Sequence, residues 1–382
     1  MNALQRKPVA SSDRVGTESA RWGVSITGAL PGLARVLWGL VRFSVALFLF
    51  VGALQLMKTG AASLDVLQSQ GMLVRNPGAT LGLGWIGALF VLSGSPMAAS
   101  ALTLVAGGAI SEIQGFTMLT GSRLGAAFVV LVVAVVYALR GGEGERRRPV
   151  STGVMALSTT ALVYVPAAAI GYGLLHWGPF HSLVITFPHQ FTDVIDLVYG
   201  GLIARVEAWS PALIFLAGLG CLLASFKLID SVMPELNEQR LGKRATWVQR
   251  KWPMFALGSL VALVTMSVSV ALTVLVPLVS KRYVKREDII PYIMGANITT
   301  LGDTMLAAFA LHSPAAVRIV LAEVIAASII SVLLLGFFYV PVRRVIWRFQ
   351  RQMLVSRPRL AAFTACLFVV PVSVIGISNL VA

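Results

Sequence analysis

The sequence predicts an all-α polytopic membrane protein with two inverted-topology repeats, each containing a re-entrant hairpin, followed by a C-terminal transmembrane span. Three observations lead to this prediction. They are the apolar composition, the placement of the positive charges along the chain, and a polar pattern that occurs twice.

The composition is that of a membrane protein. Of the 382 residues, 57% are hydrophobic and only 12% are charged, and the mean hydropathy is +0.82. Soluble domains carry about 45–50% apolar and about 25% charged residues. The formal net charge is +15, but the basic residues fall in short groups between apolar runs, which favours the positive-inside pattern over a polyanion-binding surface. We therefore expect a lipid bilayer around the chain and no nucleic-acid partner.

The apolar runs define the candidate spans, since a helix needs ~20 apolar residues to cross a bilayer. The polar segment before the first run is longer than an ordinary cleaved signal peptide. Two further segments, 81–108 and 253–280, are apolar but rich in Gly, Ser, Thr and Pro, so each fits either one long tilted helix or a hairpin. The runs of sufficient length are 35–57, which is weakened by Arg35 and Arg42, and 121–140, 152–176, 209–230, 289–311, 315–340 and 360–381.

The charges decide between the two possibilities. Segments 58–80 and 177–208 are poor in Lys and Arg, so they face outward, whereas basic segments face the cytoplasm. Segment 81–120 must then begin and end outside, and 253–280 must begin and end inside. Each is most simply a re-entrant hairpin, and the two open to opposite faces. The basic segments are the N-terminal arm, 140–149, 240–251, 281–287 and 343–359.

The expected organisation follows from these assignments. We expect a multi-pass integral protein of the plasma or inner membrane with a cytoplasmic N-terminus. Its parts would be a basic arm (1–34), a first inverted repeat (35–176), an outward-facing loop (177–208), a second inverted repeat (209–340), a basic cytoplasmic loop (341–359) and a C-terminal span (360–382).

A short serine pattern occurs once in each half. "SGS" begins at Ser93, 28 positions before Gly121, and "SVS" begins at Ser267, 28 positions before Gly295. The offset between the two sets is 174 residues. Two halves of opposite topology, each with a broken apolar segment, are typical of secondary transporters, whose sites lie between the halves near mid-membrane.

The second hairpin is rich in hydroxyl groups. "TMSVSVALTVLVP" carries Thr265, Ser267, Ser269 and Thr273. Hydroxyls and freed carbonyls suit a sodium ion, and free N–H groups at half-helix ends suit an anion. The alternative is that each hydroxyl only bonds a carbonyl of its own helix. Their clustering in a hairpin, and the repetition of that hairpin, favour ligands.

The following span contains a second polar group, in "GANITTLGDT" (295–304). Asn297, Thr299, Thr300 and Asp303 lie here within an apolar run. A carboxylate at the centre of a membrane helix costs ~2.5–3.5 kcal/mol, so Asp303 is a candidate cation ligand. The alternatives are that Asp303 is protonated or lies near the outer interface. For Glu323, a second acid in a span, we predict a pair with Arg318 near the membrane surface.

Signs of other chemistry are missing. The chain has no nucleophile–base pair, no phosphate-cradling loop and no dinucleotide fingerprint, so we expect no enzyme. Cys221 and Cys366 stand alone in separate runs and support neither a metal site nor a disulfide. The expected cofactor set is empty, apart from sodium as a coupling ion.

Two motifs of the second half resemble the type II sodium–phosphate cotransporter family. "EDIIPYIMGANITT" (287–300) is similar to that family's E-x-x-x-P-x-x-x-G-x-N-I-G-T-T segment, and "MSVSVALTVLVP" (266–277) is similar to its Q-S-S-S hairpin. The resemblance spans roughly residues 70–340. It implies two inverted halves with re-entrant hairpins, and sodium and inorganic phosphate bound between them.

The resemblance assigns residues and also shows departures. Ser267 and Ser269 match the first and third serines, and Gly295, Asn297, Ile298 and Thr300 match the later motif, with Thr299 in place of a glycine. Met266 and Val268 replace the signature glutamine and the middle serine. In the first half only Ser93 and Ser95 remain, and Arg123 stands where the family has asparagine.

These features predict an alternating-access symporter that moves a small anion, phosphate by default, with sodium or protons. Ser93, Ser95, Ser267, Ser269, Arg123, Asn297 and Thr300 would bind substrate, and Thr265, Thr299 and Asp303 would bind the cation. The alternatives are a family member that carries another small anion or uses protons alone, and a membrane scaffold that does not transport.

Arg123 lies 174 positions before Asn297. A guanidinium cannot ligate sodium, but it can bind an anion or a carboxylate. We predict that Arg123 replaces the positive charge of a bound sodium ion and contacts the substrate or Asp303. The alternative is that Arg123 reaches the membrane interface and meets only headgroups and water.

Overall fold

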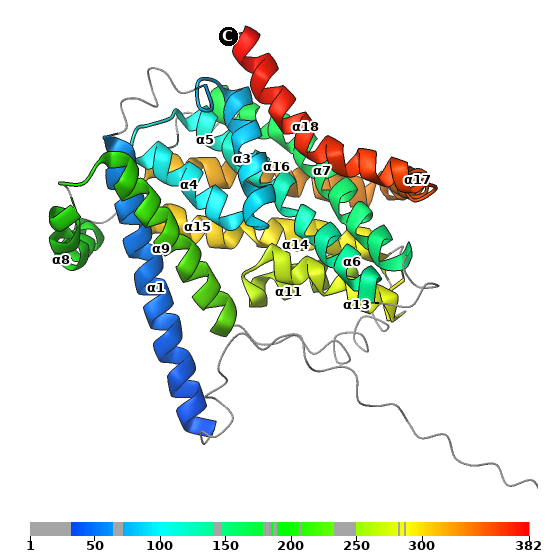
Figure 1. Cartoon of the computed structure of the whole chain (residues 1–382), viewed down its shortest axis with the longest axis horizontal. Coiled ribbons are helices and arrows are strands. Elements are labelled where there is room, and N and C mark those ends of the chain that lie inside the picture. The colour runs from blue at the N-terminus through cyan, green and yellow to red at the C-terminus, as the bar shows by residue number, and fades with distance from the viewer. Residues whose placement is uncertain are drawn as a thin grey trace, which may run out of the picture.

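The computed structural model describes residues 32–63, 72–140, 147–178, 180, 183, 185, 189–206, 208–232, 250–281, 283–285 and 288–381. Throughout this part the chain is helical, without strands (Figure 1). Six segments of it are long and apolar enough to cross a membrane, which agrees with the predicted membrane protein. They are Leu37–Ala62, Glu112–Arg140, Pro149–His176, Pro211–Val232, Pro314–Gly336 and Arg357–Val381.

The first group of short helices is α3 (Pro77–Val91), α4 (Ser95–Ala106) and α5 (Glu112–Ala126). Asn76 caps α3 by accepting a hydrogen bond from the Ala79 amide at 2.9 Å, and proline at the first position suits a helix start. The helix ends at Leu92, whose φ of 55° is left-handed and unfavourable for a branched residue. The chain therefore breaks at 92–94 and turns back as α4.

Glycines let α3 and α5 lie side by side and parallel. A Cβ on Gly84 would lie 2.0 Å from the Met118 carbonyl oxygen, and a Cβ on Gly121 would lie 2.0 Å from the Leu81 carbonyl oxygen. Because no side chain fits at these distances, only glycine permits this crossing. Since α3 and α5 are parallel neighbours, α4 runs back between their ends.

The second group repeats this arrangement with α11 (Lys251–Thr265), α12 (Val268–Thr273), α13 (Leu275–Ser280) and α14 (Ile289–Thr299). Helix α11 ends at Met266, again with a left-handed φ of 45°. A Cβ on Gly258 would lie 2.1 Å from the Tyr292 carbonyl oxygen, and a Cβ on Gly295 would lie 2.1 Å from that of Phe255. Each of these positions follows its counterpart in the first group by 174 residues.

The long helices enclose these two groups. Helix α16 (Pro314–Gly336) packs against α7 (Arg147–His176), α5 and α15 (Leu301–Ala310), and α6 (Phe128–Arg140) packs against α7. The largest hydrophobic cluster joins α7, α11, α14 and α16 around buried Tyr164 and Tyr292. The site described below lies among these helices.

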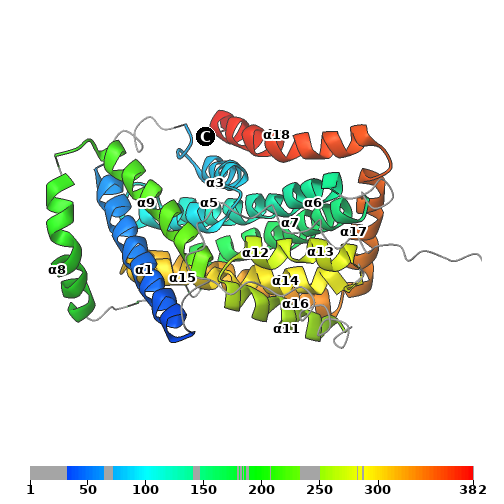
Figure 2. The same ribbon diagram turned by 60° about the horizontal axis from the view of Figure 1, so that its bottom comes forward.

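A second body of helices flanks the bundle. Helix α1 (Gly32–Ala62) pairs along its length with α9 (Pro211–Val232), as Figure 1 shows. Helix α8 (His189–Val206) lies beside α1, where the Tyr199 hydroxyl donates a hydrogen bond to the Phe48 carbonyl oxygen at 2.9 Å. In the second view the α1–α9 pair stands at an angle to the horizontal bundle (Figure 2).

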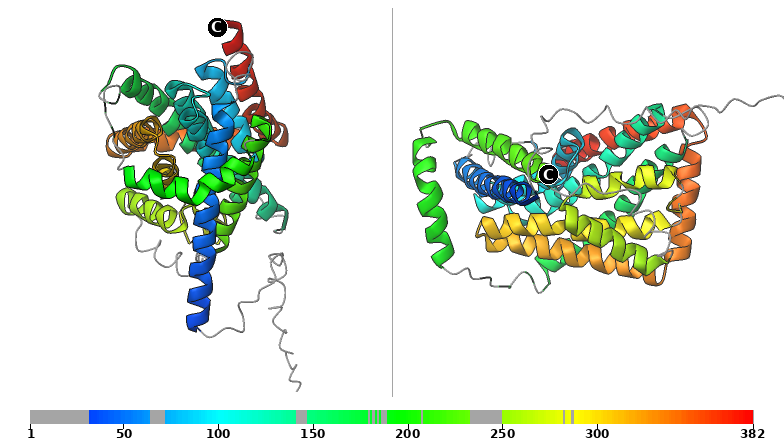
Figure 3. Two further views of the ribbon diagram at one scale, coloured as in Figure 1. Left: turned by 90° about the vertical axis from the view of Figure 1, so that its left-hand side faces the viewer. Right: turned by 90° about the horizontal axis from the view of Figure 1, so that it is seen from below.

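The last two helices cover one end and one side. Helix α17 (Tyr339–Met353) crosses the ends of the bundle helices at a steep angle, and α18 (Arg357–Val381) returns along α3 (Figures 2 and 3). Helix α17 buries Val342, Ile346 and Gln350 and carries four arginines. Most of the segment predicted as a basic loop (341–359) is therefore helical, and the helix begins two residues before it.

Two predicted spans differ from the structure. The run 289–311 is divided at Thr300 into α14 and α15, of 11 and 10 residues, each too short to cross a bilayer alone. The run 315–340 ends as a helix at Gly336, and α17 begins at Tyr339. Hydropathy averaged over the length of a span does not detect such breaks, because most residues of the run remain apolar.

Candidate functional site

The two helix breaks lie next to each other. The Ser269 hydroxyl, at the start of α12, donates a hydrogen bond to the Leu92 carbonyl oxygen at 3.3 Å. Ser267 caps α12 by accepting from the Val270 amide at 3.3 Å. Ser93 lies half-buried in the first break. The serines predicted from the repeated pattern therefore gather where the two broken segments meet.

Asp303 lies beside this meeting point and is 7% exposed. Its Oδ2 accepts a hydrogen bond from the Ser95 hydroxyl at the start of α4. Its Oδ1 accepts one from the Thr304 hydroxyl at 2.9 Å. The carboxylate thus connects α15 with the first break, 208 residues earlier in the chain.

Arg123 completes a series of polar side chains that links α5 with α15 and α4. It lies in the last turn of α5, is 2% exposed, and its Nη2 donates to the Thr304 hydroxyl oxygen at 2.6 Å. The Arg123 side chain is therefore enclosed by protein and not exposed to headgroups and water, and it reaches Asp303 through Thr304. Its Nε and Nη1 are buried without a hydrogen-bond partner. A buried guanidinium with unpaired donors is well suited to an anionic ligand.

Glu323 is a second buried acid in this cluster. It is fully buried, its Oε2 accepts a hydrogen bond from the Thr120 hydroxyl at 2.9 Å, and its Oε1 has no partner. The Arg123 guanidinium is within electrostatic reach of both Glu323 and Asp303. The ionised cluster would therefore contain one positive and two negative charges.

The predicted pair of Glu323 with Arg318 is wrong. Arg318 instead forms a two-pronged ion pair with Glu112 of α5, with Nε–Oε1 and Nη2–Oε2 distances of 2.9 and 3.0 Å. Positions five apart on a helix do not share a face, so Arg318 and Glu323 point in different directions. Charge alone suggested the pair, without regard to helical spacing.

Asn297 contacts α7 and not the polar side chains of Arg123, Thr304 and Asp303. Its Nδ2 donates to the Thr160 hydroxyl oxygen at 3.0 Å, and its main-chain carbonyl oxygen accepts from the Tyr164 hydroxyl at 2.9 Å. Both partners belong to α7. Asn297 therefore fastens α14 to α7, and within the described contacts it has a bracing role.

The three threonines predicted as ligands bond to their own helices. The hydroxyls of Thr265, Thr299 and Thr300 donate to the carbonyl oxygens of Val261, Gly295 and Ala296, at 2.8, 3.0 and 3.1 Å. This is the back-bonding alternative, although each hydroxyl keeps lone pairs for a cation. Thr265 also lies against the break, 3.3 Å from the Ser267 carbonyl oxygen.

Sequence reasoning missed Thr120, Thr304 and Tyr164. Thr120 is three positions before Arg123, so helical spacing could have placed it beside that residue, whereas Thr304 is only the sequence neighbour of Asp303. Tyr164 lies in a plain apolar span, and no pattern pointed to it.

A small cavity opens next to Asp303. Its volume is about 120 Å³, and α1, α9 and α15 line it together with Met266 at the second break. Asp303 is the charged residue of its lining, which is otherwise apolar. The carboxylate therefore borders both the series of polar side chains and a space beside the α1–α9 pair.

Comparisons with models of protein families, with curated proteins and with solved structures returned no match to this chain. Within the described residues, no three His, Cys, Asp or Glu side chains are grouped around a position for a metal ion.

Proposed function

We propose that this protein is a secondary transporter that moves a small anion by alternating access around the contact between the two helix breaks. It would be a divergent relative of the type II sodium–phosphate cotransporter family, with phosphate as its default substrate. We place it in the plasma or inner membrane, with the N-terminus in the cytoplasm.

The proposed architecture is two inverted repeats, each with one re-entrant hairpin. Helices α3 and α11 correspond end to end at the 174-residue offset, as do the left-handed breaks at Leu92 and Met266. The glycine crossings of α3 with α5 and of α11 with α14 correspond as well. The parallel course of each pair supports a segment that enters and leaves on one side. Opposite orientation of the halves follows from the charges of the flanking loops.

The burial of Arg123 with unpaired donors is the observation that supports an anionic substrate. Burying a permanent cation is costly unless it is paired, and here the Nε and Nη1 donors have no partner. An anion beside α5 would accept those hydrogen bonds, each charge-assisted. Ser95 and Ser269 stand at the starts of two short helices, where main-chain N–H groups lack partners within the helix and would add donors for an anion. An enzyme has no comparable support among the described residues.

The proposed coupling residue is Asp303. It contacts Ser95 in the first half and Thr304 in the second, so a cation bound there would act on both halves. Arg123 already supplies one fixed positive charge, which would reduce the number of sodium ions required. The coupling ion would be either sodium or the proton. Asp303 or Glu323 could accept the proton.

The test is uptake of radiolabelled phosphate by proteoliposomes, measured with a sodium gradient, with a proton gradient and with neither. Uptake driven by either gradient supports the proposal and identifies the coupling ion. Competition by unlabelled sulfate, arsenate or a small carboxylate tests other anions. If no anion is transported by well-folded protein under any gradient, the non-transporting scaffold replaces this proposal.

A further inference from the structure

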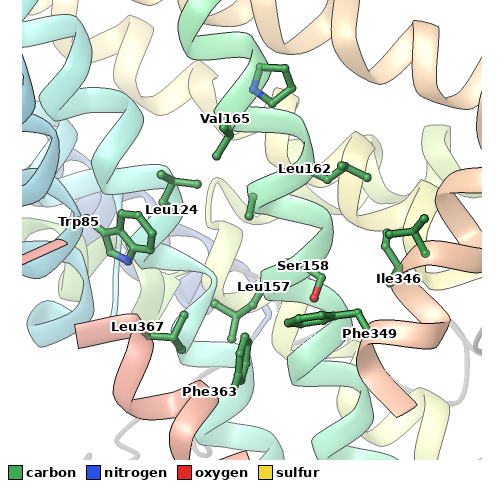
Figure 4. Close-up of a pocket in the computed structure, with 13 residues that line it drawn as sticks. Trp85, Leu124, Leu157, Ser158, Leu162, Val165, Ile346, Phe349, Phe363 and Leu367 are labelled. Carbon is green, nitrogen blue, oxygen red and sulfur yellow. The ribbon is translucent and has the colours of Figure 1, made fainter. Parts of the chain in front are cut away.

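A large apolar groove lies away from the buried cluster, between α7, α17 and α18 (Figure 4). Its volume is about 480 Å³, and side chains of α3 and α5 form its inner wall. Trp85, Leu157, Phe349 and Phe363 come from four different helices and all border it, as Figure 4 shows. Ser158 is the polar residue of its lining.

The length of the groove matches one leaflet of a bilayer. On α7 its lining extends from Leu157 to Pro166, and nine helical steps of 1.5 Å make roughly 14 Å. Half of a ~30 Å hydrocarbon core is about 15 Å. A helix of this length and ~10 Å diameter would occupy roughly 1,100 Å³, so a packed helix is too large and a single acyl chain is the better fit.

Arginines stand at one end of the groove. On α18, Arg359, Phe363 and Leu367 follow each other at intervals of four, so they share one stripe of the helix, and the last two line the groove. On α17, Arg348 lies three positions after Val345, another lining residue. Arg348 and Arg359 are both exposed. They are therefore available to a phosphate group at the mouth.

The orientation of α17 places this mouth at a membrane surface. Helix α17 crosses the ends of the bundle helices, with an apolar buried side and exposed arginines, which is the pattern of an interfacial helix (Figures 2 and 3). Such basic helices are attracted to anionic lipid. We infer that the groove is a binding site for an anionic phospholipid, with one acyl chain along α7 and its phosphate between Arg348 and Arg359. This inference depends on membrane insertion and not on transport.

The test is lipid binding to the full chain in a mild non-ionic detergent, measured by native mass spectrometry. Phosphatidylglycerol is compared with phosphatidylcholine of the same chains. We expect phosphatidylglycerol to bind more tightly. Each of Arg348→Gln and Arg359→Gln should weaken it about fivefold, since one arginine near an anionic surface contributes about 1 kcal/mol. Arg357→Gln is the matched control, because its position six residues before Phe363 lies on the other side of α18.

A second measurement tests the acyl chain. Phosphatidylglycerol with brominated chains should quench the fluorescence of the wild type more than that of Trp85→Phe, because Trp85 borders the groove. Ala161→Phe, which fills the groove, should reduce both binding and quenching. Equal binding of the two lipids, equal effects of Arg357→Gln and Arg359→Gln, or equal quenching with and without Trp85 would each overturn the inference.

Discussion

At the scale of single residues, the decisive feature is that three charged side chains of distant segments are buried together. Arg123, Asp303 and Glu323 come from α5, α15 and α16, and none is more than 7% exposed. Hydroxyl groups separate them and fill only part of their hydrogen-bonding capacity. Such an arrangement is expensive to maintain for stability alone and is typical of a functional site.

Arg123 is predicted to bind the anion directly. Arg123→Asn should lower uptake about 10- to 100-fold, because charge-assisted hydrogen bonds of about 1.5–3 kcal/mol are lost. Arg123→Lys should restore uptake only in part, since an ammonium keeps the charge without the planar fork of donors. Initial uptake rates in proteoliposomes measure both effects. Arg357→Gln, an exposed position, serves as the control. Normal transport by Arg123→Ala at every sodium concentration would contradict the role.

Asp303 is predicted to bind or relay the coupling cation. Asp303→Asn keeps the size of the side chain and an oxygen for the Ser95 hydroxyl, but removes the negative charge. We expect the protein to accumulate and insert while uptake loses its dependence on sodium or pH. The measurement is uptake against cation concentration, with gel filtration as the check on folding. An unchanged cation dependence together with unchanged transport would leave Asp303 with a structural role only.

At the scale of helices, glycines allow α3 to pack closely against α5 and α11 to pack closely against α14. Gly295→Ala should destabilise the protein, because the new Cβ would lie 2.1 Å from the Phe255 carbonyl oxygen and the backbones of α11 and α14 must separate. Gly220→Ala is the control, since nothing lies within 4 Å of its Cβ and alanine favours the helix by about 1 kcal/mol. Thermal unfolding in detergent should show a loss of several degrees for the first and no loss for the second. Equal unfolding temperatures would contradict the crossing.

Helix boundaries show where sequence reasoning succeeds and where it stops. The ends of α9 and α7 and the start of α18 agree with predicted runs to within about five residues, because polar or charged residues lie at or near most of these boundaries. The break at Thr300 was not predicted, since the run 289–311 is apolar on average and its polar residues were interpreted as ligands and not as a helix end. The site was predicted in part. Ser95, Arg123 and Asp303 were singled out and lie together, whereas the direction of Asn297 and the partner of Glu323 depend on helix packing that no local pattern encodes.

At the scale of the whole molecule, the 174-residue correspondence and the charges of the loops together predict that the two halves are oriented oppositely in the membrane. Met72 lies five residues before the start of α3 at Pro77, and Gln114 at the start of α5 donates a hydrogen bond to the Val74 carbonyl oxygen at 2.7 Å. The segment before α3 and the start of α5 therefore lie close together, as the proposed hairpin requires. The second hairpin ends at Lys281, in a segment rich in basic residues. By the positive-inside rule we expect these two ends on opposite sides of the membrane.

Single cysteines test this orientation. Met72→Cys and Lys281→Cys, both at exposed positions, would be introduced separately into a chain in which Cys221 and Cys366 are replaced by alanine. In intact cells a membrane-impermeant maleimide should label position 72, and position 281 should react only after permeabilisation. Trp177→Cys, at the exposed end of α7, is the control for the outer side. Labelling of positions 72 and 281 from the same side would exclude hairpins that open to opposite faces, and with them alternating access between two inverted halves.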